Sequence, residues 1–150
     1  MIRLFSMFLI LLFCTPANAD HGMQQQKLEA IVKAMASDAR GEQGVVEFNY
    51  NNVLMYLISD VSHNRMRIVA PVASYDELTR AQLDAVLESN YHKALDARYA
   101  VSRGVLYAAY IHPLEEMHES QVRSAVRQVS NLALTFGSDY SSGDLAFDNQ

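Results

Sequence analysis

The sequence predicts an α+β domain in which a five-stranded antiparallel sheet carries helices on one face. Three extended runs rich in β-branched and aromatic residues lie between residues 45 and 72, and two more lie between 97 and 111. Three other segments repeat their apolar residues at spacings of three and four, as amphipathic helices do. The expected order is helix, three-stranded meander, helix, β-hairpin and helix.

The first 19 residues have the features of a signal peptide. Arg3 supplies a positive charge, Leu4 to Cys14 form an apolar run too short to span a bilayer, and Ala17-Asn18-Ala19 matches a cleavage signal. Cleavage there leaves one domain at 20–137, a flexible acidic tail at 138–150 and no cysteine. We therefore expect a periplasmic protein without disulfides or membrane insertion after cleavage. An uncleaved membrane anchor is the alternative.

Charge and motifs argue against several classes of function. The chain has a formal net charge of −5 and no basic cluster, which disfavours nucleic acid and anionic lipid as partners. Its histidines lack the spacings of a metal site, and no serine lies in a G-x-S-x-G turn. No phosphate loop or dinucleotide motif is present. We expect no metal, no cofactor and no catalytic activity.

Residues 23–37 are expected to form the first helix, and the polar segment 39–44 connects it to the sheet. The apolar residues at helical spacing are Leu28, Ile31, Val32 and Met35. A second helix is expected after Ser74, because Ser74 and Glu77 match a capping box. This helix should end near Ser89-Asn90. Its buried side should comprise Leu78, Leu83, Val86 and Leu87.

The last helix is expected to begin at His112-Pro113 and to end at Gly137. Proline suits the first position of a helix, and glycine suits the position after its end. The apolar residues between them follow spacings of three and four over several turns: Val122, Ala125, Val126, Val129, Leu132, Ala133 and Phe136.

Two tight turns set the pairing of the strands. Asn51-Asn52 is typical of a two-residue hairpin turn, which places Tyr50 opposite Val53. The residues of this hairpin on the core face are then Val46, Phe48, Tyr50, Val53, Met55 and Leu57. Arg103-Gly104 is the expected turn of the second hairpin. Both faces of that hairpin are apolar, and Arg98 favours its own side as the outward one.

The third strand of the meander should pair so that Arg65 and Arg67 point away from the core, because burying them would cost their hydration. We expect Tyr56 opposite Arg67, Leu54 opposite Val69 and Met55 opposite Ile68. Glu47, Tyr56 and Arg67 would then form one row on the outer face, more plausible as a cross-strand row than as an acid–base group.

The outer face of the sheet is too apolar for a purely solvated surface. An aromatic and branched patch edged by arginine is typical of an interaction surface. The candidate partner-binding residues are Leu54, Tyr56, Ile58, Arg67, Val69 and Tyr107. The alternative is that the first helix or the tail covers this face.

The element order resembles the type III secretion chaperone-like fold. More narrowly, the segments VLMYLIS, RMRIVAPV and VLESNYHKALDARYAVSRGVLYAAYIHPL resemble the YbjN-domain family, described as bacterial sensory transduction regulators. The resemblance implies a non-catalytic module, since chaperones of that fold dimerise and hold extended client segments on apolar surfaces. The export signal departs from those cytoplasmic chaperones and favours a periplasmic relative.

Two functions follow from these observations. The first is a periplasmic protein-binding or regulatory module, chaperone-like and homodimeric, with a protein partner. The second is a periplasmic small-ligand or lipid-binding protein, in which tyrosines and methionines line an apolar pocket between sheet and helices.

Overall fold

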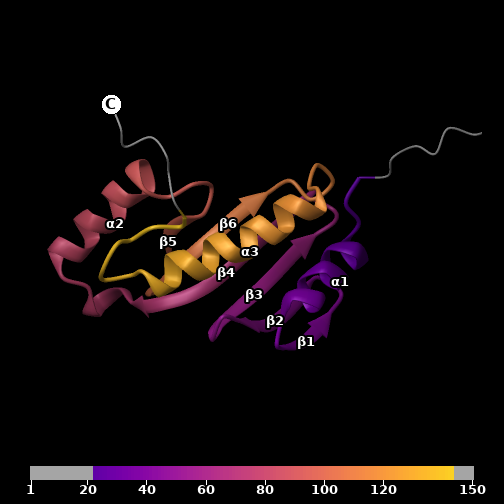
Figure 1. Ribbon diagram of the computed structural model, residues 1–150, viewed down its shortest axis with the longest axis horizontal. Helices are drawn as coiled ribbons and strands as arrows, with labels where there is room; N and C mark the ends of the chain where they lie inside the picture. The colour runs from indigo at the N-terminus through magenta and orange to yellow at the C-terminus, as the bar shows by residue number, and fades with distance from the viewer. Residues whose placement is uncertain (1–21, 144–150) are drawn as a thin grey trace, which may run out of the picture.

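The computed structural model describes residues 22–143 (Figure 1). Within them, six strands form one antiparallel sheet in the order β1-β2-β3-β4-β6-β5. The bounds are α1 Gln25–Met35, β1 Asp38–Glu42, β2 Val45–Tyr50, β3 Val53–Asp60, β4 Arg65–Ser74, α2 Arg80–His92, β5 Arg98–Ser102, β6 Val105–His112 and α3 Glu119–Leu134, with a 3₁₀ turn η1 at Tyr75–Glu77. The predicted α+β class is confirmed, with one strand more than the five expected.

The additional strand is β1, which the sequence analysis assigned to a connection. It pairs with β2 through Glu42 and Val45, on either side of a two-residue turn. Gln43 and Gly44 form that turn with φ angles of 56° and 99°, the left-handed backbone that such turns require. Because β1 consists of charged and small residues, it lacks the apolar alternation that identifies a strand in sequence.

The β2–β3 hairpin has the predicted register. Tyr50 faces Val53 and Phe48 faces Met55. Asn51 and Asn52 adopt φ angles of 51° and 62°, so the two-residue turn is confirmed. The core face is likewise confirmed, with Phe48 among the largest fully buried side chains.

The predicted register between β3 and β4 is wrong by two residues. Tyr56 faces Val69 rather than Arg67, and Ile58 faces Arg67. The loop was expected to begin at residue 59, but Asp60 still pairs with Arg65, which leaves a turn of residues 61–64. A shift of two residues changes the partners and keeps each side chain on its face, so the inside and outside of β4 are as predicted.

Two helices begin later than the sequence indicated. β4 continues through Ser74, which pairs with Val105, so the capping box of α2 is formed by Thr79 and Gln82 instead of Ser74 and Glu77. Likewise β6 continues to His112, and α3 starts at Glu119 after His118. In both cases sheet pairing extends into residues that favour a helix start locally.

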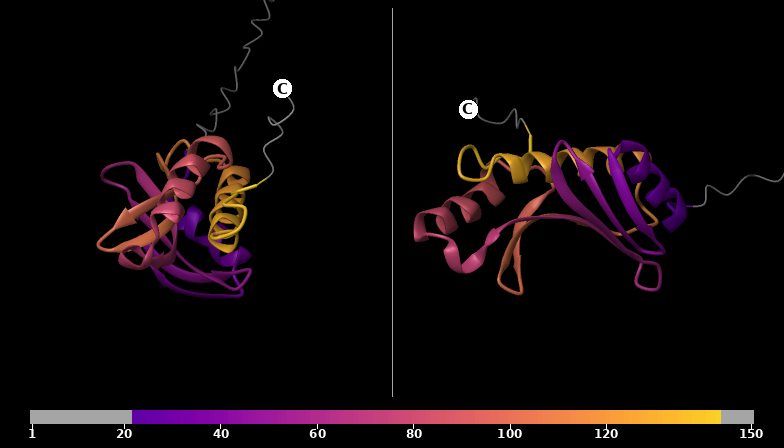
Figure 2. Two further views of the ribbon diagram at one scale, coloured as in Figure 1. Left: turned by 90° about the vertical axis from the view of Figure 1, so that its left-hand side faces the viewer. Right: turned by 90° about the horizontal axis from the view of Figure 1, so that it is seen from below.

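The core lies between one face of the sheet and the helices α1 and α3, which lie on the same side of it (Figure 2). In the second hairpin, Tyr99, Leu106, Ala108 and Tyr110 are buried on this side, and Arg98 is exposed on the other, as expected. α2 lies beside β5 and buries only Val86 and Ser89, whereas Leu87, predicted to be buried, is 67% exposed.

The segment after Gly137, expected to belong to a flexible tail, makes specific contacts up to Gly143. Tyr140 packs against Tyr99 and Phe136. The Ser142 hydroxyl accepts a hydrogen bond from the Leu95 amide at 2.6 Å. The predicted signal peptide, its predicted cleavage site and residues 144–150 lie outside the described residues. Among residues 22–143, no helix is long and apolar enough to cross a membrane.

Candidate protein-binding surface

All six candidate residues lie on the outer face of the sheet, opposite the helices. The register forms two rows from β2 onward: Val45, Ile58, Arg67 and Ile111 in one, and Glu47, Tyr56, Val69, Ala109 and Arg98 in the next. Leu54 of β3 faces Asn49 of β2, and Tyr107 of β6 faces Pro71 of β4. We call this set of residues the outer face.

Apolar side chains of the outer face remain in contact with solvent. Leu54 is 38% exposed, Ile58 39% and Ile111 57%. Tyr56, Val69 and Tyr107 are half-buried. No helix of the described part of the chain covers this side. The alternative that α1 covers it is wrong, because α1 packs on the core side.

The charges of the outer face differ from the predicted row of Glu47, Tyr56 and Arg67. The cation beside Glu47 is Arg40 of β1, whose Nη2 lies 3.2 Å from Glu47 Oε1. Partial burial raises the pKa of Tyr56, and the charge of Glu47 and a hydrogen bond to it add to this effect. Tyr56 is therefore neutral near pH 7 and can act as a hydrogen-bonding group on this face.

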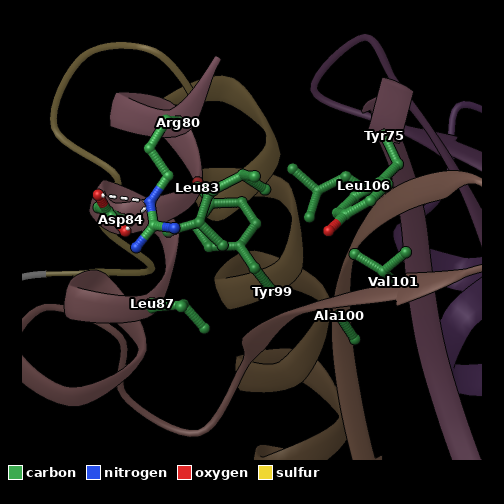
Figure 3. A pocket seen from close by; sticks show the side chains of 10 residues that line it. Tyr75, Arg80, Leu83, Asp84, Leu87, Tyr99, Ala100, Val101 and Leu106 are labelled. Carbon is green, nitrogen blue, oxygen red and sulfur yellow. Dashed lines mark hydrogen bonds and ion pairs between the residues drawn. The ribbon is translucent and has the colours of Figure 1, made fainter. Parts of the chain in front are cut away.

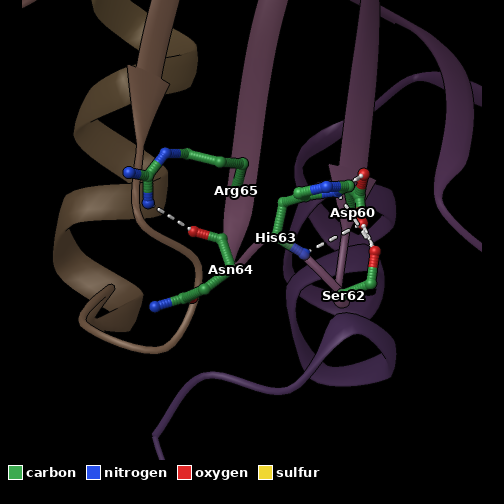
Figure 4. A network of polar contacts seen from close by, with 5 residues as sticks. All are labelled: Asp60, Ser62, His63, Asn64 and Arg65. Atoms are coloured by element: carbon green, nitrogen blue, oxygen red, sulfur yellow. Dashed lines mark hydrogen bonds and ion pairs between the residues drawn. The ribbon is translucent and has the colours of Figure 1, made fainter.

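A serine, a histidine and an aspartate meet in the β3–β4 turn (Figure 4). His63 Nδ1 lies 2.7 Å from Asp60 Oδ2 and 3.1 Å from Ser62 Oγ. The Ser62 hydroxyl and His63 lower the pKa of Asp60 to about 2. A catalytic triad needs both ring nitrogens, one for the serine and one for the aspartate. Since one nitrogen serves both groups here, the cluster is a turn-stabilising contact.

A cavity of about 360 Å³ lies between α2 and the β5–β6 hairpin (Figure 3). Its lining is mainly apolar and includes Tyr75, Leu83, Leu87, Val101 and Leu106. The Arg80–Asp84 ion pair forms part of the lining, with Arg80 Nε 2.9 Å from Asp84 Oδ1. Elsewhere in residues 22–143, no three histidine, cysteine or acidic side chains gather as a metal site would require.

Sequence reasoning missed Asn90, a polar residue at this end of the molecule. Its side chain reaches from α2 to the backbone of Tyr99 in β5. The local pattern predicted only a helix end at this position, because an asparagine near a helix terminus is common and a partner distant in the chain leaves no local signal.

Comparisons with known proteins identify the fold. No protein-family model and no curated protein matches the chain. Solved structures do: a chain of the HopA1–SchA chaperone–effector complex aligns with a TM-score of 0.55 and 10% identity, covering 73% of this chain and 88% of that one. A chain of the ExsC–ExsE complex aligns with a TM-score of 0.54 and 11% identity, covering 73% and 90%.

A third similar structure is the Yersinia pestis type III secretion chaperone SycH in complex with a fragment of YscM2. It aligns with a TM-score of 0.52 and 11% identity, covering 73% of this chain and 99% of that one. All three similar structures are complexes that include a protein partner. At such low identity the likeness concerns the fold. The chain therefore has an α+β fold similar to that of the type III secretion chaperones.

Proposed function

We propose that the chain is a non-catalytic, chaperone-like module that binds another protein in the periplasm and acts as a homodimer. The observation that carries the proposal is the outer face, an uncovered sheet surface with Leu54, Ile58 and Ile111 exposed. Exposed apolar side chains of this kind are costly to leave in water, and binding of a protein removes them from solvent. The fold supports the proposal because similar chains occur in complexes with proteins.

The periplasmic location is part of this proposal and rests on the first 19 residues. Export followed by cleavage before Asp20 fits their charge and apolar pattern. Membership of the YbjN-domain family also remains a proposal, based on the three segments named above. Cell fractionation with amino-terminal sequencing tests the location, and a protein that begins at Asp20 is the expected result.

The outer face is tested by introducing a charge into it. Tyr56→Asp and Ile58→Asp should each weaken binding by roughly thirtyfold, about 2 kcal/mol, if these residues lie at the centre of an interface. Self-association is measured by analytical ultracentrifugation, and partner contact by photo-crosslinking from position 107, which lies on the same face and is unaltered in these variants. Leu134→Asp is the matched control, because Leu134 is 57% exposed on α3, away from the sheet's outer face.

Two outcomes would contradict the outer face as the surface that binds the protein partner. If Tyr56→Asp and Ile58→Asp fold normally and both self-association and crosslinking equal those of Leu134→Asp, the outer face is not the binding surface. If only self-association is lost, the face belongs to the dimer and the protein partner binds elsewhere.

A further inference from the structure

β5 forms one edge of the sheet, and its backbone groups alternate in direction. It pairs with β6 through Ser102 and Val105, which flank the two-residue turn. The Tyr99 amide donates to Asn90 Oδ1 at 2.7 Å, and Asn90 Nδ2 donates to the Tyr99 carbonyl at 3.1 Å. Both groups of Tyr99 therefore point away from β6. Alternate residues of an antiparallel strand share this direction, so the amide and carbonyl of Val101 also point away from β6.

Val101 is the position at which this edge is open. Asn90 satisfies Tyr99 much as a neighbouring strand would, but no described residue forms a hydrogen bond with the amide or carbonyl of Val101. A free donor and a free acceptor on one extended residue are complementary to one residue of another extended chain. The occupant that fits this edge is thus a peptide backbone.

The cavity beside α2 lies on the face to which such a peptide would direct a side chain. The side chain of Val101 is 49% exposed and lines the cavity together with Leu83 and Leu106. In a paired strand, the residue directly opposite Val101 places its side chain on the same face as Val101. An apolar side chain at that position would enter the cavity seen in Figure 3.

Two arginines give this edge a positive charge. Arg98 begins β5 and Arg103 follows its end, and neither forms an ion pair within residues 22–143. The guanidinium of Arg98 donates to the carbonyls of Leu95 and Ala97. Carbonyl partners leave its charge uncompensated, so an acidic residue in the occupant would be attracted to either end of the strand.

We propose that the β5 edge binds an extended segment of a partner protein, which pairs with Val101, places an apolar side chain in the cavity and bears a carboxylate near Arg98 or Arg103. This inference rests on the proposed protein-binding function and adds a second contact to it, separate from the outer face. Asn90 limits how far along β5 the segment can pair, because its side chain already bonds the outward amide and carbonyl of Tyr99.

The test uses protein exported from the full-length gene and a fluorescent threonine-based peptide with a central leucine and an aspartate near each end. Fluorescence anisotropy measures its binding. Binding is expected for this peptide and should weaken at least about tenfold when the central leucine is replaced by lysine, whose charge would be desolvated in the cavity.

Val101→Pro is the decisive variant. Proline removes the outward amide without removing a bond to β6, so the strand is expected to persist while peptide binding falls at least about tenfold. Val101→Lys is a second variant, which keeps the backbone amide and places a charged side chain at the opening of the cavity. Peptide binding by this variant should also fall. The matched control is Ala39→Pro, which removes an outward amide from β1 at the opposite edge and should leave peptide binding unchanged.

Several outcomes would overturn the proposal. The first is equal binding of the peptide by Val101→Pro, Val101→Lys and the unaltered protein. The second is no binding of the leucine peptide at all. The third is that Val101→Pro loses self-association while the unaltered protein does not bind the peptide. That result would assign the edge to a second copy of the chain. Tyr56→Asp should not affect the peptide, so failure of the outer-face function and failure of this proposal are separable.

Discussion

The two edges of the sheet are protected in different ways. β1 carries Asp38, Arg40 and Glu42 in a strand of five residues, and charges on a short edge strand discourage further pairing. β5 has one charged residue, Arg98, and relies on Asn90 of α2 to occupy the backbone groups of Tyr99. The first protection belongs to the strand's own sequence, and the second depends on a helix being held in place.

The helices at the two edges are anchored differently as well. α1 buries Leu28, Ile31 and Val32, and its Glu29 carboxylate accepts the Gly44 amide at 2.8 Å. α2 buries only Val86 and Ser89, and hydrogen bonds from Ser89 and Asn90 hold it to the rest of the fold. Few buried apolar contacts mean a lower cost of local opening, so the β5 end should open more readily than the β1 end.

The largest expected difference between the two ends is in matched leucine-to-alanine substitutions. Leu28→Ala in α1 should lower the free energy of unfolding by about 2–5 kcal/mol, because Leu28 is fully buried. Leu87→Ala in α2 should change it by less than about 0.5 kcal/mol, because that side chain is largely exposed. Urea unfolding measures both, and equal losses would contradict the comparison.

An intermediate effect is expected from the contact that closes the β5 edge. Asn90→Ala leaves the amide and carbonyl of Tyr99 without their partner and should cost about 1–3 kcal/mol. Hydrogen exchange at the Tyr99 amide should accelerate more than exchange in β2. Ser62→Ala, which removes an exposed hydrogen bond in the β3–β4 turn, is the control and should have little effect. Unchanged exchange at Tyr99 would show that Asn90 does not protect the edge.

The smallest effect concerns the hydroxyl of Tyr99, which donates to the Leu132 carbonyl at 2.7 Å. Tyr99→Phe should cost about 0.5–1.5 kcal/mol at neutral pH. Burial raises the pKa of Tyr99 above its ordinary value near 10. The unfolded chain therefore loses this proton first, and stability should fall as the pH rises above 10.

Stability curves between pH 8 and pH 11 test this dependence. Tyr99→Phe should show a smaller decline than the unaltered protein over that range. Burial also raises the pKa of Tyr110, so part of the decline should remain in the variant. Identical slopes in the two proteins would mean that Tyr99 does not contribute to the pH dependence.

Much of the outer face could be predicted from alternation along the strands. The six candidate residues share one face in the structure because side chains of a strand alternate and an error of two residues preserves the face. Their cross-strand partners could not be predicted, since the β3–β4 turn is shorter than the polar composition of residues 59–64 indicated. Arg40 was missed as the partner of Glu47 because β1 lacks an apolar pattern.

The amino-acid sequence by itself determined the α+β class, the two tight hairpins at Asn51-Asn52 and Arg103-Gly104, and the division of the strands into an inner and an outer face. These features depend on residues close together in the chain, whose backbone preferences and periodicity are local. Only the tertiary structure decided that β1 joins the sheet, that β4 and β6 continue past their expected ends, and that Asn90 caps Tyr99. Those outcomes depend on hydrogen bonds between distant segments, which form only after packing has brought the segments together.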